Sequence, residues 1–184
     1  HRDFSNVLKV KKNAPDLFKQ FLKSKGYRAK NSDYYLFDDL SKHKKADFVL
    51  FIGGGVCDVY QPKEKSIRLN RKLLQLAYDY GIPVHILTKN KLVLDDLDLL
   101  LKINAQNHAS VNLTITLADN DQQKIFEPNA SNTNERFNTV KLLRQQSIAS
   151  GIYFLPVLPF IADSDDNMQS IFRQAKLADA QFVY

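Results

Sequence analysis

From residue 47 onward, short apolar stretches alternate with longer amphipathic ones. The short stretches are rich in β-branched and aromatic residues, and they cover residues 47–52, 83–88, 110–116 and 152–158. In the longer stretches apolar residues recur at helical spacing, over residues 66–80, 95–105, 132–149 and 166–178. Strands that are apolar on both faces are typical of buried parallel sheets, and their alternation with helices predicts βα repeats. Short connections favour a parallel barrel or an open, doubly wound sheet.

Capping residues mark the ends of several predicted helices. Ser66 can cap the first helix, and Gly81 ends it where a left-handed backbone is expected. Asn132 or Thr133 can open the third helix, and Gly151 can close it. These local signals predict the boundaries of the repeats as well as their order.

The third and fourth helices carry two further expectations. The apolar face of the third helix should include Phe137, Val140, Leu142 and Leu143. The fourth helix follows the acidic run 163–166, which lacks the glycine and the distant glutamate of a calcium-binding loop. We therefore expect Asp165 or Asp166 to be a helix N-cap.

The two ends of the chain differ from the repeats. A helix is predicted to begin at 13–16 and to end before Gly26, whereas residues 31–45 show no clear period and are interpreted as a loop or insertion with one short helix. The last four residues, 181–184, have the pattern of a strand. We expect one domain over 1–184, with a basic helix and loop in 1–46 and βα repeats in 47–184, cut from a larger barrel.

Composition narrows the class of protein. A chain of 184 residues with 44% hydrophobic content can bury one core, and it contains neither a signal-peptide pattern nor an apolar run of the roughly 20 residues that span a bilayer. We therefore expect a soluble, cytoplasmic protein with no membrane partner. Cys57 is the only cysteine, which excludes an internal disulfide and a thiolate metal site built by this chain alone. The four histidines show no metal-ligand spacing.

Positive charge is concentrated near the N-terminus. The formal net charge is +6, and residues 1–45 hold 12 Lys or Arg against 5 Asp, so the excess belongs to this quarter of the chain. A solvated basic helix is one interpretation of this charge, and attraction to a phosphate-bearing polymer such as DNA is the other.

Candidate chemistry is expected after the strands. In parallel α/β folds, ligands bind beyond the carboxyl ends of the strands, where the following helices begin. The segments to consider are residues 53–58, 88–90, 114–119 and 156–166. All four are rich in glycine, proline or polar residues.

These segments carry a family resemblance. The strings are GGGVCDVYQPKEK (53–65), LTKNKLVLDDLDLL (87–100), VNLTITLAD (111–119), IFEP (125–128), ERF (135–137) and GIYFLPVLPFIADSDDN (151–167). In this order they resemble radical S-adenosylmethionine (radical SAM) proteins of the spore photoproduct lyase and DNA repair photolyase type. The likeness covers nearly the whole chain, including VKKNAPDLFKQFL (10–22).

The resemblance implies a fold and an activity. Such proteins have a partial TIM barrel of six βα units, and a CxxxCxxC loop after the first strand holds a [4Fe-4S] cluster that binds S-adenosylmethionine. A 5′-deoxyadenosyl radical then abstracts a hydrogen atom from a thymine dimer. Here the strand ending at residue 52 would be the second barrel strand, so the cysteine loop would lie before His1. The chain as given would be inactive alone.

The resemblance also assigns residues. Those matched to cofactor-binding positions are Gly53, Gly54, Gly55, Lys89, Thr114, Pro156, Leu158 and Phe160. In the family the lysine pairs with the cofactor carboxylate, the threonine position reaches the ribose, and the proline-rich loop lines the adenine pocket. Residues matched to the substrate region are Asp58, Tyr60, Gln61, Glu127 and Arg136. Cys57 is a candidate hydrogen-atom donor, or an inert thiol.

Other hypotheses remain open. One is a degenerate barrel that binds a nucleotide or nucleic acid without redox catalysis, and another is a metabolic α/β enzyme such as an aldolase, although the sequence offers no phosphate loop for it. A partial barrel would also leave a strand edge uncovered, which predicts self-association through that edge.

Overall fold

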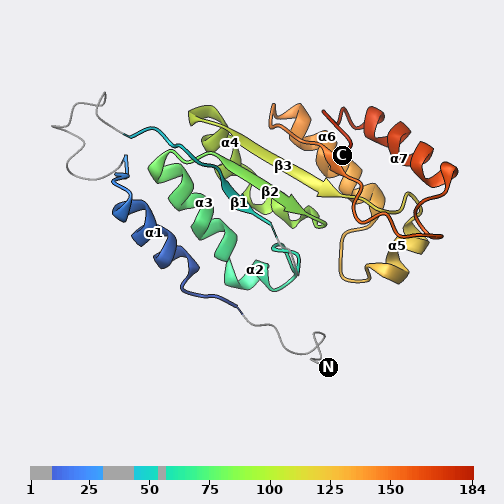
Figure 1. Cartoon of the computed structure of the whole chain (residues 1–184), viewed down its shortest axis with the longest axis horizontal. Helices are drawn as coiled ribbons and strands as arrows, with labels where there is room; N and C mark the ends of the chain where they lie inside the picture. Colours follow the sequence, from blue (N-terminus) through green and yellow to red (C-terminus); the bar gives the residue numbers. More distant parts are fainter. Residues whose placement is uncertain (1–9, 31–43, 54–56) are drawn as a thin grey trace.

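A four-stranded parallel sheet forms the centre of the protein (Figure 1). The computed structural model describes residues 10–30, 44–53 and 57–184. The strands are β1 (Leu50–Ile52), β2 (Val84–Thr88), β3 (Ala109–Thr114) and β4 (Ile152–Tyr153), and each pairs with its neighbours in chain order. The protein is therefore a mixed α/β protein, as the alternation of apolar and amphipathic stretches predicted.

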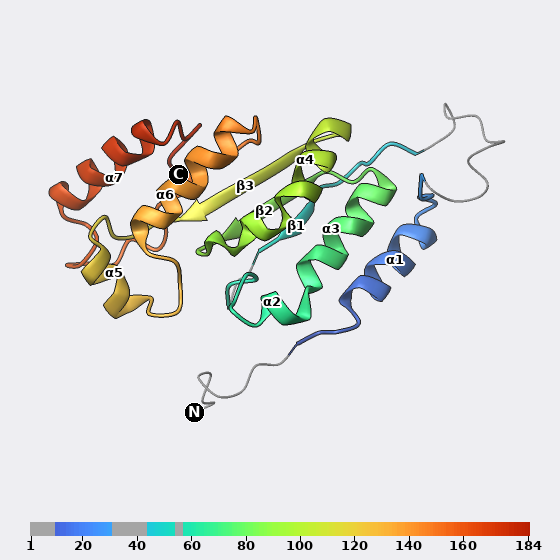
Figure 2. The same ribbon diagram turned by 180° about the vertical axis from the view of Figure 1, so that it is seen from behind.

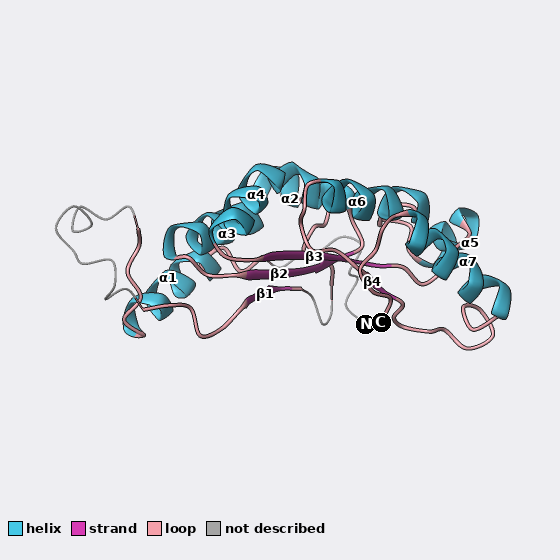
Figure 3. Ribbon diagram, turned by 90° about the horizontal axis from the view of Figure 1, so that it is seen from above, coloured by secondary structure: helices cyan, strands magenta, loops and turns pink. Residues whose placement is uncertain are grey.

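Helices connect and follow the strands. They are α1 (Ala14–Ser24), α2 (Glu64–Ile67), α3 (Leu69–Tyr80), α4 (Leu97–Gln106), α5 (Asn120–Phe126), α6 (Thr133–Gln145) and α7 (Asp165–Leu177), with a 3-10 helix, Lys91–Asp96, before α4. Figure 2 shows α1 beside α3. Figure 3 shows that α3, α4 and α6 lie on one side of the sheet, whereas the opposite face carries no described helix. We call that opposite face the open face.

The core lies between the sheet and these helices. Strand residues such as Ile86, Val111 and Leu113 are fully buried against helix residues such as Leu74 and Leu100. Each fully buried aliphatic side chain contributes roughly 1.5–3 kcal/mol relative to exposure. The apolar stripes of the helices, together with one face of each strand, therefore stabilise the arrangement.

The prediction that the strands are buried on both faces holds for β3 and is wrong for β1 and β2. All six residues of β3 are buried, whereas Phe51 is exposed and burial alternates along β2, with His85 and Leu87 only half-buried. The described helices lie on one side of the sheet, which leaves Phe51, His85 and Leu87 on the other side partly exposed. This one-sided arrangement also differs from a doubly wound sheet, in which helices cover both faces.

The predicted strand at the end of the chain pairs with β4. Val183 forms a parallel bridge with Ile152. The amide N–H of Tyr184 donates to the carbonyl of Ile152 at 2.9 Å, and the amide of Ile152 donates to the carbonyl of Phe182 at 3.0 Å. Residues 181–184 therefore continue the sheet beyond β4.

Two predicted helix boundaries are confirmed. Gly81 follows α3 with a φ of +68°, so the glycine C-cap takes the expected left-handed conformation. Asn132 caps α6 and forms a reciprocal capping box with Glu135. The N-terminal helix α1 also begins and ends where its proline and Gly26 predicted, whereas most of the predicted 31–45 loop lies outside the described residues.

Other local predictions are wrong. Arg68, not Ser66, precedes α3, because Ser66 belongs to the separate short helix α2. Helix α6 ends at Gln145 instead of continuing to Gly151, which belongs to the start of β4 pairing. Ser164 caps α7 in place of Asp165 or Asp166, which occupy its first turn.

The structure contains two helices that the sequence did not predict, and it places one residue differently from the prediction. Helix α5 and the 3-10 helix were not predicted, because both fall in short stretches with no complete apolar stripe. Leu142, expected in the core, is exposed, whereas Phe137, Val140 and Leu143 are buried. Within the described residues, no helix combines the length and apolar character needed to cross a bilayer.

Candidate functional site

Loops at the carboxyl ends of the four strands form the candidate site. Because all the strands are parallel, the segments that follow them lie at one edge of the sheet (Figure 1). Gly53 follows β1, Lys89 follows β2, Thr114 ends β3, and residues 154–164 follow β4. We call this edge the rim. Gly54 and Gly55, also predicted to bind the cofactor, lie outside the described residues.

Asp58 joins the loop after β1 to the end of β2. Its Oδ1 accepts a hydrogen bond from the Thr88 hydroxyl at 2.6 Å and another from the Tyr60 amide at 2.8 Å. Its Oδ2 accepts from the amide of Lys89. These contacts hold Lys89 at the rim, so Asp58 positions a neighbouring residue as well as occupying the predicted substrate region.

Tyr60, assigned to the substrate region, points into the protein. Its side chain is 1% exposed, and its hydroxyl donates to Asp96 Oδ2 at 3.1 Å. Burial and the Asp96 carboxylate raise the pKa of Tyr60 well above its ordinary value. Arg71 donates to Asp96 Oδ1 at 3.1 Å, so Tyr60 belongs to a structural network under the rim. Gln61, next to it, uses its carbonyl to accept from the Glu64 amide in a turn.

Three charged side chains meet at the rim. Lys89 Nζ pairs with Glu127 Oε1, and Arg136 Nη2 lies 2.5 Å from Glu127 Oε2. Lys89 remains about one-third exposed, Glu127 is mostly buried and Arg136 is completely buried. We call these residues the Lys89–Glu127–Arg136 cluster. The structure thus brings together one predicted cofactor residue and two residues predicted for the substrate region.

Arg136 fixes the cluster to the protein backbone. Its Nε donates to the carbonyl of Ser131 at 2.7 Å, and its Nη1 donates to the carbonyl of Thr114 at 2.8 Å. Ser131 in turn donates its amide N–H to the carbonyl of Lys89 at 3.2 Å. The guanidinium therefore links the end of β3 to the loop before α6. Arg136 therefore acts as a loop clamp, a residue that holds two loops together, because the N–H groups of a guanidinium can donate in several directions at once.

The cluster keeps Glu127 ionised. Burial alone would raise the pKa of Glu127, but the positive charges of Arg136 and Lys89 outweigh this effect and hold the pKa below its ordinary value. At neutral pH the rim therefore presents an ammonium group beside a carboxylate. Such a pair can bind a ligand that itself carries both charges, if the ligand exchanges with the existing partners.

The two threonines at the end of β3 differ in their contacts. The Thr116 hydroxyl donates to the carbonyl of Leu155 at 3.2 Å, which ties the end of β3 to the loop after β4. Among the described residues, the Thr114 hydroxyl has no hydrogen-bond partner, and its side chain lies on the open face in register with Tyr153. Of the two threonines, Thr114 is therefore the one whose hydroxyl forms no hydrogen bond within the part of the chain that the structure describes.

The loop after β4 is held at its base and exposed at its tip. Asn167 anchors the base, since its Nδ2 donates to the carbonyls of Thr116 at 3.0 Å and Ala162 at 2.8 Å. Pro156 is exposed and Leu158 is half-buried, whereas Phe160 is 99% exposed with a φ of +63°. The phenyl ring of Phe160 therefore contacts solvent, and only its loop belongs to the rim.

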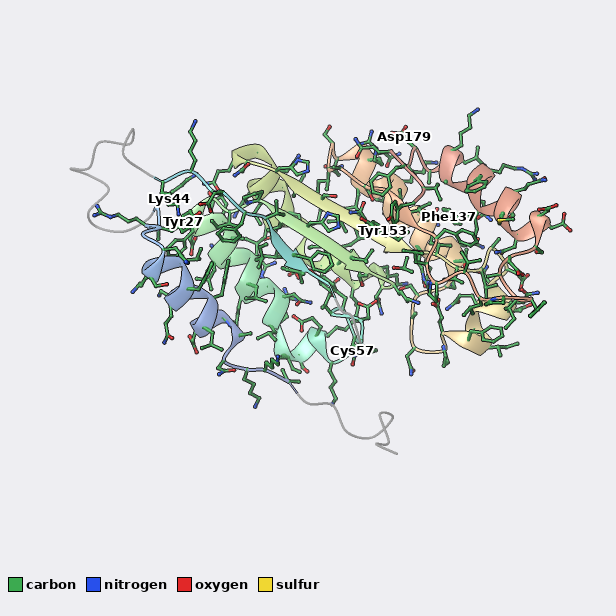
Figure 4. All side chains as sticks on the ribbon, viewed as in Figure 1. Tyr27, Lys44, Cys57, Phe137, Tyr153 and Asp179 are labelled. Atoms are coloured by element: carbon green, nitrogen blue, oxygen red, sulfur yellow. The ribbon has the colours of Figure 1, made fainter. Side chains whose placement is uncertain are left out.

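Cys57 lies in the loop between β1 and α2, with its side chain exposed (Figure 4). This loop follows the carboxyl end of β1, so the thiol is at the rim end of the sheet. Among the described residues, no group of three or more His, Cys, Asp or Glu side chains is arranged to hold a metal ion.

Sequence reasoning missed two residues that shape the rim. Asn167 stands in the run ADSDDN, where an anchoring asparagine cannot be told from a surface one. Asp96, which binds Tyr60 and Arg71, is followed by Asp98 in a helix, a pattern that indicates a solvated face. The structural role of Asp96 is visible only in the fold, where it accepts hydrogen bonds from the buried Tyr60 and from Arg71.

Comparisons with known proteins identify relatives without an assigned function. The uncharacterized protein MJ0683 of Methanocaldococcus jannaschii is 31% identical over 125 residues, which make up 68% of this chain and 46% of that protein. The uncharacterized protein Rv2578c of Mycobacterium tuberculosis is 25% identical over 126 residues, 68% of this chain and 37% of that protein. The chain thus spans less than half the length of these relatives. No family model and no solved structure matches it.

Proposed function

We propose that this chain is the cofactor- and substrate-holding core of a radical SAM enzyme of the spore photoproduct lyase type. In this proposal the sheet belongs to a partial barrel whose interior is the open face, and the enzyme is a cytoplasmic lyase acting on nucleic acid photoproducts. The observation that carries the proposal is the meeting of Gly53, Lys89 and Thr114, matched residues from three strand ends, at one rim.

The rim residues fit the amino-acid end of S-adenosylmethionine. That end carries a carboxylate and an ammonium group, and Lys89 and Glu127 offer the opposite charges side by side. Lys89 would hold the carboxylate, and Glu127 the ammonium group, while Arg136 keeps Glu127 in place. The hydroxyl of Thr114, which has no hydrogen-bond partner among residues 10–30, 44–53 and 57–184, would form a hydrogen bond with the ribose. Gly53 has no side chain, which leaves room for the Phe51 ring in the place where a Cβ would stand, so Gly53 shapes this end of the site through Phe51.

The chain's own residues do not fit a [4Fe-4S] cluster, which needs three or four ligands of the thiolate type. Cys57 is the only cysteine of the sequence. We therefore place the ligands of the iron-sulfur cluster outside these 184 residues. When bound, the cofactor supplies a radical that abstracts a hydrogen atom. The part played by this chain is to orient the cofactor and to hold the substrate against the open face.

The test is cofactor binding by the full-length protein. Equilibrium dialysis with labelled S-adenosylmethionine should show a dissociation constant that Lys89→Gln raises by about tenfold or more, because a charge-assisted hydrogen bond is lost. Lys91→Gln is the matched control. Lys91 lies two residues after Lys89 and also pairs with a glutamate, Glu135. It should change the dissociation constant less than twofold.

A second measurement tests the redox part of the proposal. Full-length protein reconstituted without oxygen should bind about four irons, as a [4Fe-4S] cluster requires. Absence of S-adenosylmethionine binding, or equal effects of the two lysine substitutions, would contradict the assignment of the rim. Absence of bound iron would contradict the radical reaction. It would leave the proposed S-adenosylmethionine site at the rim to be judged by the dialysis experiment alone.

One observation favours the alternative of nucleic acid binding without redox catalysis. The described residues 10–30 and 44–53 carry nine Lys or Arg residues against only Asp16 and Asp47. Such a surface attracts phosphate groups through counterion release. Salt-dependent DNA binding by a protein that takes up neither iron nor S-adenosylmethionine would support this alternative over the enzyme.

A further inference from the structure

The open face carries an ordered set of polar and aromatic side chains. Strand register places Phe51, His85 and Ser110 in one row across β1, β2 and β3. The next row on the same face contains Leu87 and Asn112, and the row at the rim contains Thr114 and Tyr153. No described helix covers these residues (Figure 3). None of the proposed cofactor contacts uses the first row.

Asn112 organises the polar part of this face. It is completely buried, and its Oδ1 accepts a hydrogen bond from the Gly151 amide at 2.8 Å. Its Nδ2 must therefore donate, and it donates to Ser110 Oγ at 2.9 Å and faces His85 Nε2 at 3.4 Å. This orientation makes Nε2 of His85 the acceptor and leaves the proton on Nδ1. Within the described chain, Nδ1 has no hydrogen-bond partner.

His85 is held as a neutral ring. Burial lowers its pKa below the ordinary value, and His108 adds to the effect. The imidazole therefore offers one N–H donor at neutral pH without a charge. The neutral state follows from burial between the strands, whereas the position of the proton on Nδ1 follows from the amide of Asn112.

Aromatic rings frame the histidine. The rings of Phe51 and His85 are 5.5 Å apart and tilted by 31°, and Tyr153 meets His85 edge-on at 6.3 Å. Phe182 and Tyr184 extend this group beyond Tyr153, at 5.8 Å and 5.4 Å. Phe51 and His85 keep part of their surfaces exposed, so a planar ligand has rings on which to stack.

The distribution of charge selects the ligand. The open-face side chains of β1 to β4 carry no formal charge when His85 is neutral, whereas the charges of the Lys89–Glu127–Arg136 cluster lie at the rim. A charged ligand group next to His85 would lose its hydration without gaining a partner. An uncharged planar ring with a carbonyl acceptor would gain both stacking and the Nδ1 hydrogen bond.

We propose that His85, oriented by Asn112 and framed by Phe51 and Tyr153, forms a recognition site for an uncharged pyrimidine-type base of the substrate. The site deepens the proposed function, on which it rests for the nucleic acid that supplies the base. His85 is a binding residue here and takes no part in bond breaking. Its row lies below the rim, so base and cofactor would occupy neighbouring parts of one face.

Thymidine is the probe, because it is uncharged and lacks the adenine of the cofactor. In the full-length protein, adding thymidine should shift the NMR resonance of the His85 ring and quench tyrosine fluorescence with the same dissociation constant. His85→Phe keeps a planar ring but removes the donor, and it should weaken binding by about tenfold. Tyr153→Leu should weaken binding by a similar factor through lost stacking.

The controls separate this site from the cofactor site. His108→Phe makes the same substitution at an exposed histidine that precedes β3, and at about pH 8, where His85 is neutral with or without His108, it should leave thymidine binding unchanged. Thymidine binding that neither His85→Phe nor Tyr153→Leu weakens would overturn the proposal, and so would absence of binding. Retention of S-adenosylmethionine binding in that case would show that only the base site has failed. Circular dichroism confirms folding of each variant.

Discussion

Arg136 is the largest side chain that the described part of the chain buries completely. Its guanidinium contacts a carboxylate and two backbone carbonyls, and all three of these groups accept hydrogen bonds from a cation. An arginine in this setting is costly to remove, because the mostly buried Glu127 would keep only the partly exposed Lys89 as a partner and two backbone carbonyls would lose their donors. The residue therefore couples the stability of the protein to the geometry of the rim.

We predict that Arg136→Ala lowers the free energy of unfolding by about 3–5 kcal/mol, the range for breaking a buried ion pair. Urea denaturation measures the change. Arg144→Ala is the control, because Arg144 pairs with the exposed Asp179 at 3.3 Å, and such surface pairs contribute about 1 kcal/mol or less. Equal losses for the two variants would show that the Arg136 cluster is not a structural clamp.

At the scale of single elements, helix α6 has the most complete start. Asn132 accepts a hydrogen bond from the amide of Glu135, and the Glu135 carboxylate accepts from the amide of Asn132. Arg136 lies close to the start of this helix, so the position of the N-cap Asn132 also fixes the position of the Arg136 guanidinium. An error in this cap would displace the functional rim as well as weaken the helix.

Asn132→Ala should therefore lower the free energy of unfolding by about 1 kcal/mol, the usual effect of losing an N-cap. Asn138→Ala in the same helix is exposed and has no capping role, so it should leave stability unchanged or raise it slightly. Thermal denaturation of both variants provides the measurement. A loss of stability in Asn138→Ala equal to that in Asn132→Ala would contradict the capping argument.

Elements could be predicted from the sequence where the signals are local. β2 and β3 follow from apolar runs, and the ends of α3 and α6 follow from Gly81 and Asn132. The placement of helices on one side could not be predicted, because an apolar residue such as Leu87 suits a covered face and an open face equally well. The path of the chain, not the composition of the strand, decides which of the two occurs.

The candidate site was predictable only as a set of positions. The resemblance selected Lys89, Glu127 and Arg136, but their pairing joins residues 38 and 9 positions apart, and no periodicity indicates it. The inward position of Tyr60 likewise depends on Asp96, which lies 36 residues away. Such contacts require the three-dimensional arrangement of loops, since each partner alone suits a solvated surface.

At the scale of the whole molecule, the sheet has two edges that no described strand covers. β1 forms one edge, and residues 181–184 form the other. On the second edge the N–H of Tyr184 and the carbonyl of Phe182 bond to β4. The peptide groups of Val183 alternate with these and face away from the sheet, where they can pair with another strand.

We predict that the 184-residue chain self-associates through these edges as its concentration rises, and light scattering measures the effect. Val183→Pro removes an outward N–H and should lower the association, with the bonds from residues 181–184 to β4 retained. Val157→Pro is a matched control in the exposed loop after β4, away from either edge. A chain that stays monomeric at all concentrations would contradict the prediction.

The order of the strands in the sheet is also the order in which the ribosome makes them. Each new strand therefore meets a partner that has already emerged, and no early segment must wait for a distant one. Paired residues of neighbouring strands are 25 to 39 positions apart, because each parallel connection needs a crossover, and these separations are shorter than a shuffled strand order would give. The sequential order therefore lowers the cost of loop closure for a parallel sheet. During synthesis the sheet can therefore be extended one strand at a time, since each new strand pairs with the strand made before it.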